Sequence, residues 1–339
     1  MIGKGECEMK KIAIIVPYFG KLPYNFQLWL EGCRHNSTID WFIYTDDKTN
    51  YNYPSNVKVT YCDFSDIKSR FQSKIDFQIV LDKPYKLCDY KVSYGDMFSD
   101  ELNGYDYWGY CDVDLLFGNI RKFLTDEVLE QYEKIGFQGH LTLYKNTPEV
   151  NTRYKTEISG IMSYKDIFTT TENCLFDEPV SDEMYEYLKI PVYKKVEFAH
   201  LDKYAVDFYL KHLPMEENYK NVHQVFTWNN GALNRWYIDK DGKVNSEEFM
   251  YIHFFCRKMD IRIAECSDVQ NILIYPNVIE LFEGIPTGEL VKKKAHTSKL
   301  VFYIKYLYKN KNKISPKKLI QYVINKKEQV ERSNQGVKK

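Results

Sequence analysis

The stretch Tyr105-Asp-Tyr-Trp-Gly-Tyr-Cys-Asp-Val-Asp-Leu-Leu-Phe-Gly118 lies in the first half of a chain of 339 residues. Its aromatic and apolar first part predicts a buried strand. Two aspartates, Asp112 and Asp114, follow where that strand ends. Carboxylate oxygens are the ligands that Mg²⁺ and Mn²⁺ prefer, and these ions bridge the phosphates of nucleotides. The stretch therefore predicts a divalent metal site; the alternative is a pair of turn aspartates that cap the next helix.

Apolar runs and helical patterns alternate on the N-terminal side of this stretch. The runs expected to be strands cover residues 11–17, 41–47 and 57–62, and the helical patterns cover residues 23–35 and 86–102. This alternation predicts an α/β fold with an open, mostly parallel sheet and flanking helices. Ligands of such sheets bind outside the carboxyl ends of the strands, where the sequence places Tyr18, Asp46 and Asp47 as well. Neither GxGxxG nor GxxxxGK[ST] occurs, which disfavours a classical dinucleotide fold and a P-loop.

The composition is that of a folded protein, with 44% hydrophobic and 28% charged residues. No stretch approaches the roughly 18 to 20 uncharged apolar residues of a membrane-spanning helix. The start lacks an apolar signal core, and the eight cysteines never form a CxxC pair. We therefore expect reduced thiols and a cytoplasmic protein. Residues 1–10 are a candidate extension: Met9, followed by two lysines, is a candidate natural start, with the first eight residues added by a vector or an alternative start.

The net charge of zero hides an asymmetry between body and tail. Residues 292–339 hold 15 Lys and Arg against two acids, whereas residues 1–291 hold 32 basic and 45 acidic residues. Within the tail, two basic amphipathic segments, 298–308 and 317–324, are joined at Pro316. They predict helices that bind an anionic membrane surface, with packing on the acidic body as the alternative. No nucleic-acid-binding motif accompanies the charge, so nucleic acid is not an expected partner.

Seven segments give the sequence a resemblance to a known family. It resembles the GT-A-fold, nucleotide-sugar-dependent glycosyltransferases, in particular a poorly characterised group from bacterial capsule and O-antigen clusters. The resemblance covers about residues 11–275 and is carried by Ile14-Ile-Val-Pro-Tyr-Phe-Gly20, Phe42-Ile-Tyr-Thr-Asp46, Pro84-Tyr-Lys-Leu-Cys-Asp89, Trp108-Gly-Tyr-Cys-Asp-Val-Asp-Leu-Leu-Phe-Gly118, Gly139-His-Leu-Thr-Leu-Tyr-Lys-Asn146, Phe176-Asp-Glu178 and Tyr251-Ile-His253.

The resemblance implies a GT-A-like sheet whose Rossmann-like half binds the nucleotide sugar. It places that half in residues 11–135 and an acceptor-binding and catalytic half in 136–291. The basic helical tail of residues 292–339 follows from the charge pattern instead. It implies Mn²⁺ or Mg²⁺ held by Asp112, Asp114 and His253. The residues implied to contact the nucleotide are Pro17, Tyr18 and Phe19 at the base, Asp46 at its imide N–H, Asp112, and Lys86, Asp89, Lys91, Arg257 and Lys258 near the phosphates.

Glycosyl transfer with inversion also needs a carboxylate that takes the proton of the acceptor hydroxyl. Asp177 and Glu178 are the first candidates, and Asp182 and Glu183 the next. A retaining enzyme needs no such base, and the sequence leaves the stereochemistry open.

The expected reaction moves a hexose, with galactose (pyranose or furanose) as the leading expectation, from a UDP-sugar to a lipid-linked oligosaccharide of a bacterial surface polysaccharide. The alternatives are a non-catalytic nucleotide- or carbohydrate-binding protein and a sugar-1-phosphate nucleotidyltransferase.

Overall fold

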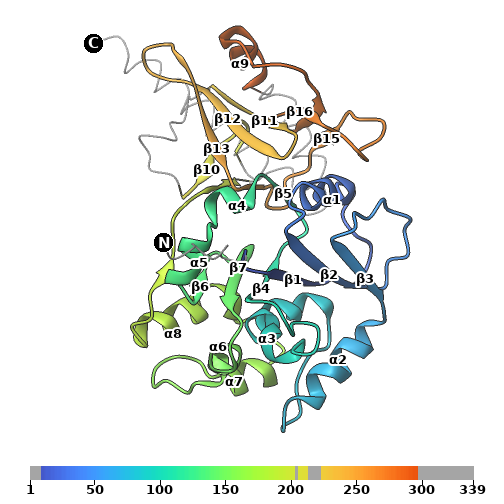
Figure 1. The fold of residues 1–339 in the computed structure, drawn as a ribbon, viewed down its shortest axis with the longest axis vertical. Coiled ribbons are helices and arrows are strands. Elements are labelled where there is room, and N and C mark those ends of the chain that lie inside the picture. The colour runs from blue at the N-terminus through green and yellow to red at the C-terminus, as the bar shows by residue number, and fades with distance from the viewer. Residues whose placement is uncertain (1–8, 203–204, 213–222, 297–339) are drawn as a thin grey trace, which may run out of the picture.

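The first sheet of the molecule is mixed and mostly parallel (Figure 1). The computed structural model describes residues 9–202, 205–212 and 223–296. The strand order is β3-β2-β1-β4-β7-β6-β8, with β1 to β4 parallel and β7 antiparallel to β4. The strands are β1 (Ile12–Pro17), β2 (Ile39–Thr45), β3 (Val57–Tyr61), β4 (Tyr107–Cys111), β6 (Lys134–Ile135), β7 (Leu141–Lys145) and β8 (Val192–Tyr193). The predicted open α/β sheet is confirmed at this level.

Helices cover both faces of this sheet, which explains why its central strands are apolar on both sides. Along β1, Ile12 and Ile14 pack against α1 (Phe26–Arg34), whereas Ala13 and Ile15 face the opposite core. That second core is closed by α2 (Phe64–Ser73), the 3₁₀ helix η1 (Pro84–Ser93) and α3 (Tyr94–Met97). Figure 1 shows α1 on one side of the strands and α2 and α3 on the other.

The expectation of a single α-helix over residues 86–102 is wrong. The segment forms η1 and then one α-helical turn, α3. In a 3₁₀ helix, side chains three positions apart eclipse, so Lys86 and Asp89 meet as an ion pair of 2.7 Å. Both side chains are buried, and their pairing favours the tighter winding. The other short helices are α4 (Ile120–Phe123), α5 (Asp126–Gln131), α6 (Pro148–Thr152), η2 (Arg153–Lys155), α7 (Tyr164–Thr169), the π-helical turn η3 (Phe176–Val180) and α8 (Ser181–Tyr187).

A small second sheet joins the first sheet to a third. Its order is β10-β9-β14-β5, with β10 (Leu210–Lys211), β9 (Phe198–Leu201), β14 (Tyr251–His253) and β5 (Leu115–Phe117). Side chains alternate between its faces, so Tyr251 packs with the first sheet while Ile252 packs with the third. The second sheet is therefore buried between two cores.

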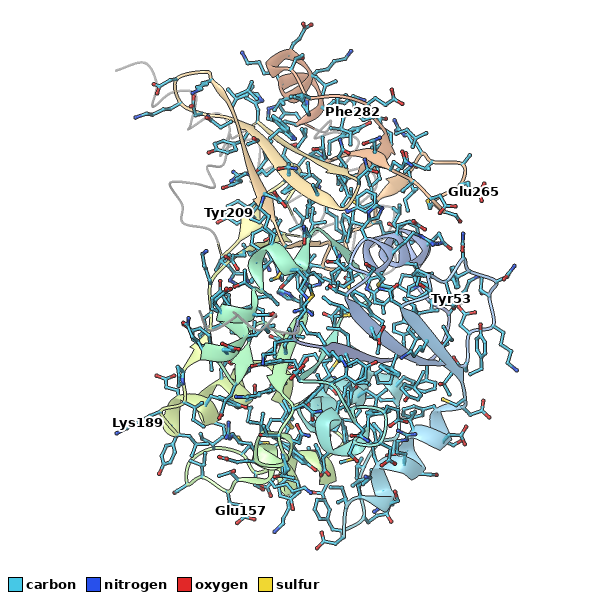
Figure 2. All side chains as sticks on the ribbon, viewed as in Figure 1. Tyr53, Glu157, Lys189, Tyr209, Glu265 and Phe282 are labelled. Atoms are coloured by element: carbon cyan, nitrogen blue, oxygen red, sulfur yellow. The ribbon has the colours of Figure 1, made fainter. Side chains whose placement is uncertain are left out.

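The third sheet is almost wholly antiparallel and forms the upper part of Figure 1. Its strands, in sheet order, are β13 (Val244–Phe249), β12 (Ala232–Ile238), β11 (Gln224–Asn229), β16 (Asn271–Tyr275), β17 (Val278–Leu281) and β15 (Asp260–Ile261). Helix α9 (Gly288–Lys294) covers one face through Val291, and Phe282, labelled beside α9 in Figure 2, packs against the same core.

The basic tail falls mostly outside the described residues. Its first residues, Lys292 to Lys294, complete α9, and the segments 298–308 and 317–324 lie beyond residue 296. Within the part of the chain that the structure describes, no helix is both long and apolar enough to span a bilayer.

Candidate functional site

The Asp112-Val-Asp114 segment crosses from the first sheet to the second. It joins the end of β4 to the start of β5, so Asp112 and Asp114 lie where the two sheets meet. Backbone pairing fixes both ends: the Asp112 N–H donates to the His140 carbonyl at 3.0 Å, and the Phe254 N–H donates to the Asp114 carbonyl at 3.1 Å. These bonds hold the segment beside β7 and β14, which come later in the chain.

The register of the second sheet brings three histidines to this junction. His253 on β14 lies opposite Leu115 of β5 and beside His200 of β9. His140 directly precedes β7 and contacts both rings, with ring centroids 4.5 Å from His253 and 5.3 Å from His200. All three side chains are buried.

Asp114 and His253 form the closest acid–imidazole contact of the site. The His253 Nε2 atom lies 3.2 Å from Asp114 Oδ1 and 4.0 Å from Asp112 Oδ2. Burial alone would raise the pKa of Asp114, but the hydrogen bond and charge of His253 and the Cys256 N–H lower it below its ordinary value. Asp114 is therefore an anion at neutral pH.

Asp112 is tied to Asp177 through Lys91. The Lys91 ammonium donates to Asp112 Oδ1 at 2.9 Å, to Asp177 Oδ2 at 2.9 Å and to the Gly139 carbonyl at 3.0 Å. Burial lowers the pKa of Lys91, but the two carboxylates outweigh it and raise the pKa well above its ordinary value. Lys91 stays charged and holds Asp112 in place.

The donor set Asp112, Asp114 and His253 fits a divalent metal. Each residue offers one ligand atom, and the three atoms lie within 4.8 Å of one another. The side chains of Asp112 and Asp114 are 34% and 23% exposed, so an ion reaches them from solvent, while His253 is buried and fixed by its strand. Two carboxylates and one imidazole suit Mn²⁺ in particular, because Mg²⁺ prefers oxygen ligands throughout.

The chain leaves β14 through two residues with left-handed backbone. Phe255 and Cys256 have φ values of 50° and 58°, which residues other than glycine rarely adopt. This turn aims the Cys256 N–H at Asp114 Oδ2, 2.9 Å away. Strain of this kind costs about 1–3 kcal/mol per residue and concentrates at binding and catalytic sites.

Glu178 lies against a glycine beside this network. A Cβ atom built on Gly139 would lie 2.7 Å from Glu178 Cγ and 3.0 Å from Asp177 Oδ2, and Gly139 has a φ of 70°. Glu178 is half-buried, whereas Asp177 is 4% exposed and paired with Lys91. Burial and the charge of Asp177 raise the pKa of Glu178. Of the two carboxylates, Asp177 is the one that Lys91 holds, and Glu178 is the more exposed.

We expect Gly139→Ala to lower stability by about 2–4 kcal/mol, because it adds left-handed strain and forces Glu178 away from the backbone. Thermal or urea unfolding measures the change. Gly160→Ala is the matched control, since Gly160 also has positive φ but a Cβ there would meet nothing within 4 Å. Equal losses in both variants would contradict close packing at Gly139.

The four residues expected at the nucleobase do not lie together in the structure. Pro17 ends β1, and the half-buried Tyr18 follows it at the site, where burial and the Asp114 carboxylate raise the pKa of its hydroxyl. Phe19 turns into the core and packs on Phe64 at 5.4 Å. Asp46 is exposed and accepts from the Gly20 N–H at 2.7 Å, which braces the loop after β1.

The residues expected near the phosphates are also dispersed. Lys91 lies in the site, but Lys86 and Asp89 form a buried pair, and Asp89 accepts from the N–H groups of Cys174 and Phe176. This pair holds the loop that leads to Asp177. The Arg257 guanidinium donates hydrogen bonds to the backbone carbonyls of residues 202, 205, 206 and 207 and to the Asn277 side chain. Lys258 is exposed.

The second-choice carboxylates lie on α8. Asp182 is paired with the buried Lys134, and Glu183 is exposed.

Sequence reasoning missed His140, His200 and Tyr251 as residues of this site. His140 lies in a segment that carried the family resemblance but was itself given no role, and His200 sits in the short strand β9, which the sequence pattern did not single out. The signal that would have found them is the pairing of β9 with β14, which a single sequence does not display.

A family model described as a family of unknown function, DUF6625, matches residues 14–283. A search of curated proteins finds no match. Among solved structures, the chain is similar to the glycosyltransferase GlyE of Streptococcus pneumoniae TIGR4, with 14% identity, a TM-score of 0.24, and coverage of 43% of this chain and 38% of that one. The apo-form of GlyE gives 15% identity, a TM-score of 0.25 and coverage of 55% of each chain. The match thus spans 38% and 55% of the two GlyE chains, and likeness at these TM-scores supports no conclusion here.

Proposed function

The chain belongs to DUF6625, a family of unknown function, and we propose from its site that it is a metal-dependent glycosyltransferase with a nucleotide-sugar donor. One observation carries the proposal: Asp112, Asp114 and His253 converge at the carboxyl end of β4, next to the end of β1. From β1 the strand order runs to β2 on one side and to β4 on the other, so this is the point where an open α/β sheet binds its ligand.

The proposed roles follow from position and charge. A Mn²⁺ or Mg²⁺ ion held by Asp112, Asp114 and His253 would neutralise the diphosphate of the donor. Lys91 keeps Asp112 oriented, and Tyr18 at the end of β1 faces the same space beside Asp114. The metal ion would thus bind the leaving group, and the ring of Tyr18 would contact the base or the sugar.

Glu178 is the proposed general base. It takes the proton of the acceptor hydroxyl while that oxygen bonds to the anomeric carbon and the bond from this carbon to the diphosphate breaks. Attack from the side opposite the leaving group inverts the anomeric centre, so the configuration of the product, read by NMR, tests this role. Retention would instead assign the proton to the diphosphate and remove Glu178 from the reaction.

We expect Glu178→Gln to lower kcat by about 10²- to 10⁴-fold, the usual contribution of a general base. Burial, Asp177 and Asp112 raise the pKa of Glu178, whereas Lys91 and His253 lower it. Because the base acts deprotonated, the rate of the parent enzyme should fall as pH drops through this raised pKa, above the ordinary value of about 4.3. Glu183→Gln on exposed α8 is the control and should keep both rate and profile. An unchanged acid limb in the Glu178 variant would assign the limb to another group.

A donor screen tests the proposal as a whole. The full chain is incubated with UDP-, GDP- and CMP-sugars, with and without Mn²⁺, and release of the nucleoside diphosphate or monophosphate is measured. We expect hydrolysis of one donor class only with metal. Binding without hydrolysis or transfer would indicate a non-catalytic binding protein, and formation of a nucleotide sugar from a sugar-1-phosphate would indicate a nucleotidyltransferase.

For the donor and acceptor we propose a UDP-hexose, with galactose as the leading sugar, and a lipid-linked oligosaccharide of a bacterial capsule or O-antigen. The support is the sequence resemblance and the charge of the tail, which suits a protein bound to the inner face of the membrane. Confinement at a bilayer raises the effective concentration of such an acceptor.

We expect removal of residues 297–339 to abolish co-sedimentation with anionic vesicles while leaving donor hydrolysis unchanged. This cut keeps α9 and its buried Val291 and Ala295 intact, so the third sheet retains its cover. Neutral vesicles and high salt are the controls, because an electrostatic contact is lost in both. Undiminished vesicle binding by the shortened chain would assign the tail a structural role.

A further inference from the structure

A second group of metal-ligating side chains lies beside the carboxylates. His140, His200 and His253 each place one ring nitrogen so that the three atoms lie within 4.8 Å of one another. The three side chains are 2%, 6% and 5% exposed and come from three elements: the residue before β7, strand β9 and strand β14. The cluster is therefore built by the sheets rather than by a surface loop.

Two nitrogens of this cluster have no partner. Among the described residues, neither His200 Nε2 nor His253 Nδ1 has a hydrogen-bond partner, although both atoms are buried. A buried polar atom left without a partner destabilises the fold. A cation bound at His253 Nδ1 would give that nitrogen a partner.

The spacing of the rings also suits a metal. His140 Nε2 and His200 Nδ1 are 3.4 Å apart. Two nitrogens about 2.0–2.1 Å from one tetrahedral zinc lie about 3.3–3.4 Å apart, and a hydrogen bond has a similar length.

A hydroxyl outside the cluster orients His140. Tyr251 Oη lies 2.8 Å from His140 Nδ1. If Nδ1–H donates to Tyr251, the lone pair of His140 is on Nε2, the atom that faces His200. A second hydrogen bond of this type fixes the ring of a metal-binding histidine in many proteins.

We propose that His140, His200 and His253 form a second metal site, selective for a transition-metal ion such as Zn²⁺, next to the oxygen-rich Asp112–Asp114 site. Three imidazoles favour Zn²⁺ or Co²⁺ over Mg²⁺. The proposal stands independently of glycosyl transfer. Because His253 belongs to both groups, and its Nε2 faces Asp114 while its Nδ1 is unpartnered, metal in one site changes the affinity of the other.

Cobalt titration of the chelator-treated full chain tests the site. We expect one equivalent of Co²⁺ to give the strong visible bands of a nitrogen-rich, low-coordinate centre, and Zn²⁺ to abolish them. An Asp112→Asn, Asp114→Asn double variant should keep these bands. His200→Gln and His140→Gln should weaken Co²⁺ binding by more than about 100-fold, since loss of an outer partner alone costs about 10- to 100-fold.

Tyr251→Phe and His223→Gln complete the set. Tyr251→Phe removes only the orienting hydroxyl and should weaken Co²⁺ binding by about 10- to 100-fold. His223 pairs with His296 at 2.8 Å beside the third sheet, so His223→Gln should bind Co²⁺ as the parent does.

The proposal is overturned if the parent chain gives no such bands, if the Asp112, Asp114 variant loses them, or if a His200→Gln protein with the parent melting temperature binds Co²⁺ unchanged. If the histidine variants fail to fold, the parent titration and Tyr251→Phe still decide. Failure of the donor screen with intact Co²⁺ binding would refute the proposed function and leave this site standing.

Discussion

Replacing Asp114 with asparagine is expected to lower Mn²⁺-dependent donor turnover by more than about 100-fold. The substitution keeps the size of the side chain but removes the charge that faces His253 Nε2 at 3.2 Å and one of the two carboxylates of the donor set. Steady-state release of the nucleoside diphosphate measures the loss, and electron paramagnetic resonance of free Mn²⁺ measures the affinity.

Asp126→Asn is the matched control for this variant. Asp126 lies in the first turn of α5, outside the donor set, and its carboxylate meets Arg121 at 3.6 Å. The turnover of the Asp126→Asn variant should equal that of the parent enzyme. Full activity of the Asp114 variant, or of the parent in excess chelator, would refute a metal bound by Asp114.

Lys91→Met is expected to destabilise the fold by about 3–5 kcal/mol, the usual cost of removing one partner of a buried ion pair. The substitution leaves Asp177, 4% exposed, without the cation 2.9 Å away, and frees the Gly139 carbonyl as well. Urea unfolding followed by circular dichroism measures the change in the free energy of unfolding.

Two further variants separate burial from pairing. Lys91→Met combined with Asp177→Leu should recover much of the loss, because an apolar pair leaves no unpaired charge. Lys165→Met breaks the exposed 3.0 Å pair with Glu157 and should have no measurable effect. If Lys91→Met is as harmless as Lys165→Met, the charge of Lys91 does not hold this part of the fold.

The local pattern of the sequence was sufficient for the first sheet. The continuous apolar run of β1 and the aromatic run of β4 are buried on both faces, as their composition predicts. The pattern was insufficient for η1, because the Lys86–Asp89 pair, invisible to hydrophobic periodicity, accompanies 3₁₀ winding. The second sheet could not be predicted either, since two- to four-residue strands such as β9 and β14 carry too few residues for a periodicity.

The candidate site was predicted where its residues are adjacent in sequence and missed where a sheet assembles them. Asp112 and Asp114 are recognisable as a pair, and His253 was expected through the family resemblance. His200 depends on the register between β9 and β14. Arg257 was expected near phosphate because a cation follows His253, but its guanidinium donates to the backbone carbonyls of residues 202, 205 and 206. The charge of a residue and of its neighbours in sequence does not predict the partners of a buried guanidinium.

The crossing of Asp112-Val-Asp114 between two sheets has a consequence for folding. The contact between Cys256 and Asp114 joins residues 142 positions apart, and β5 pairs with β14 across a similar separation. Contacts this distant form late, because the intervening chain must be ordered first. A nascent chain that ends before β14 carries both aspartates but neither His253 nor the strand that holds it. The proposed metal site therefore needs the chain as far as β14, and a fragment of the N-terminal half is expected to be inert during synthesis.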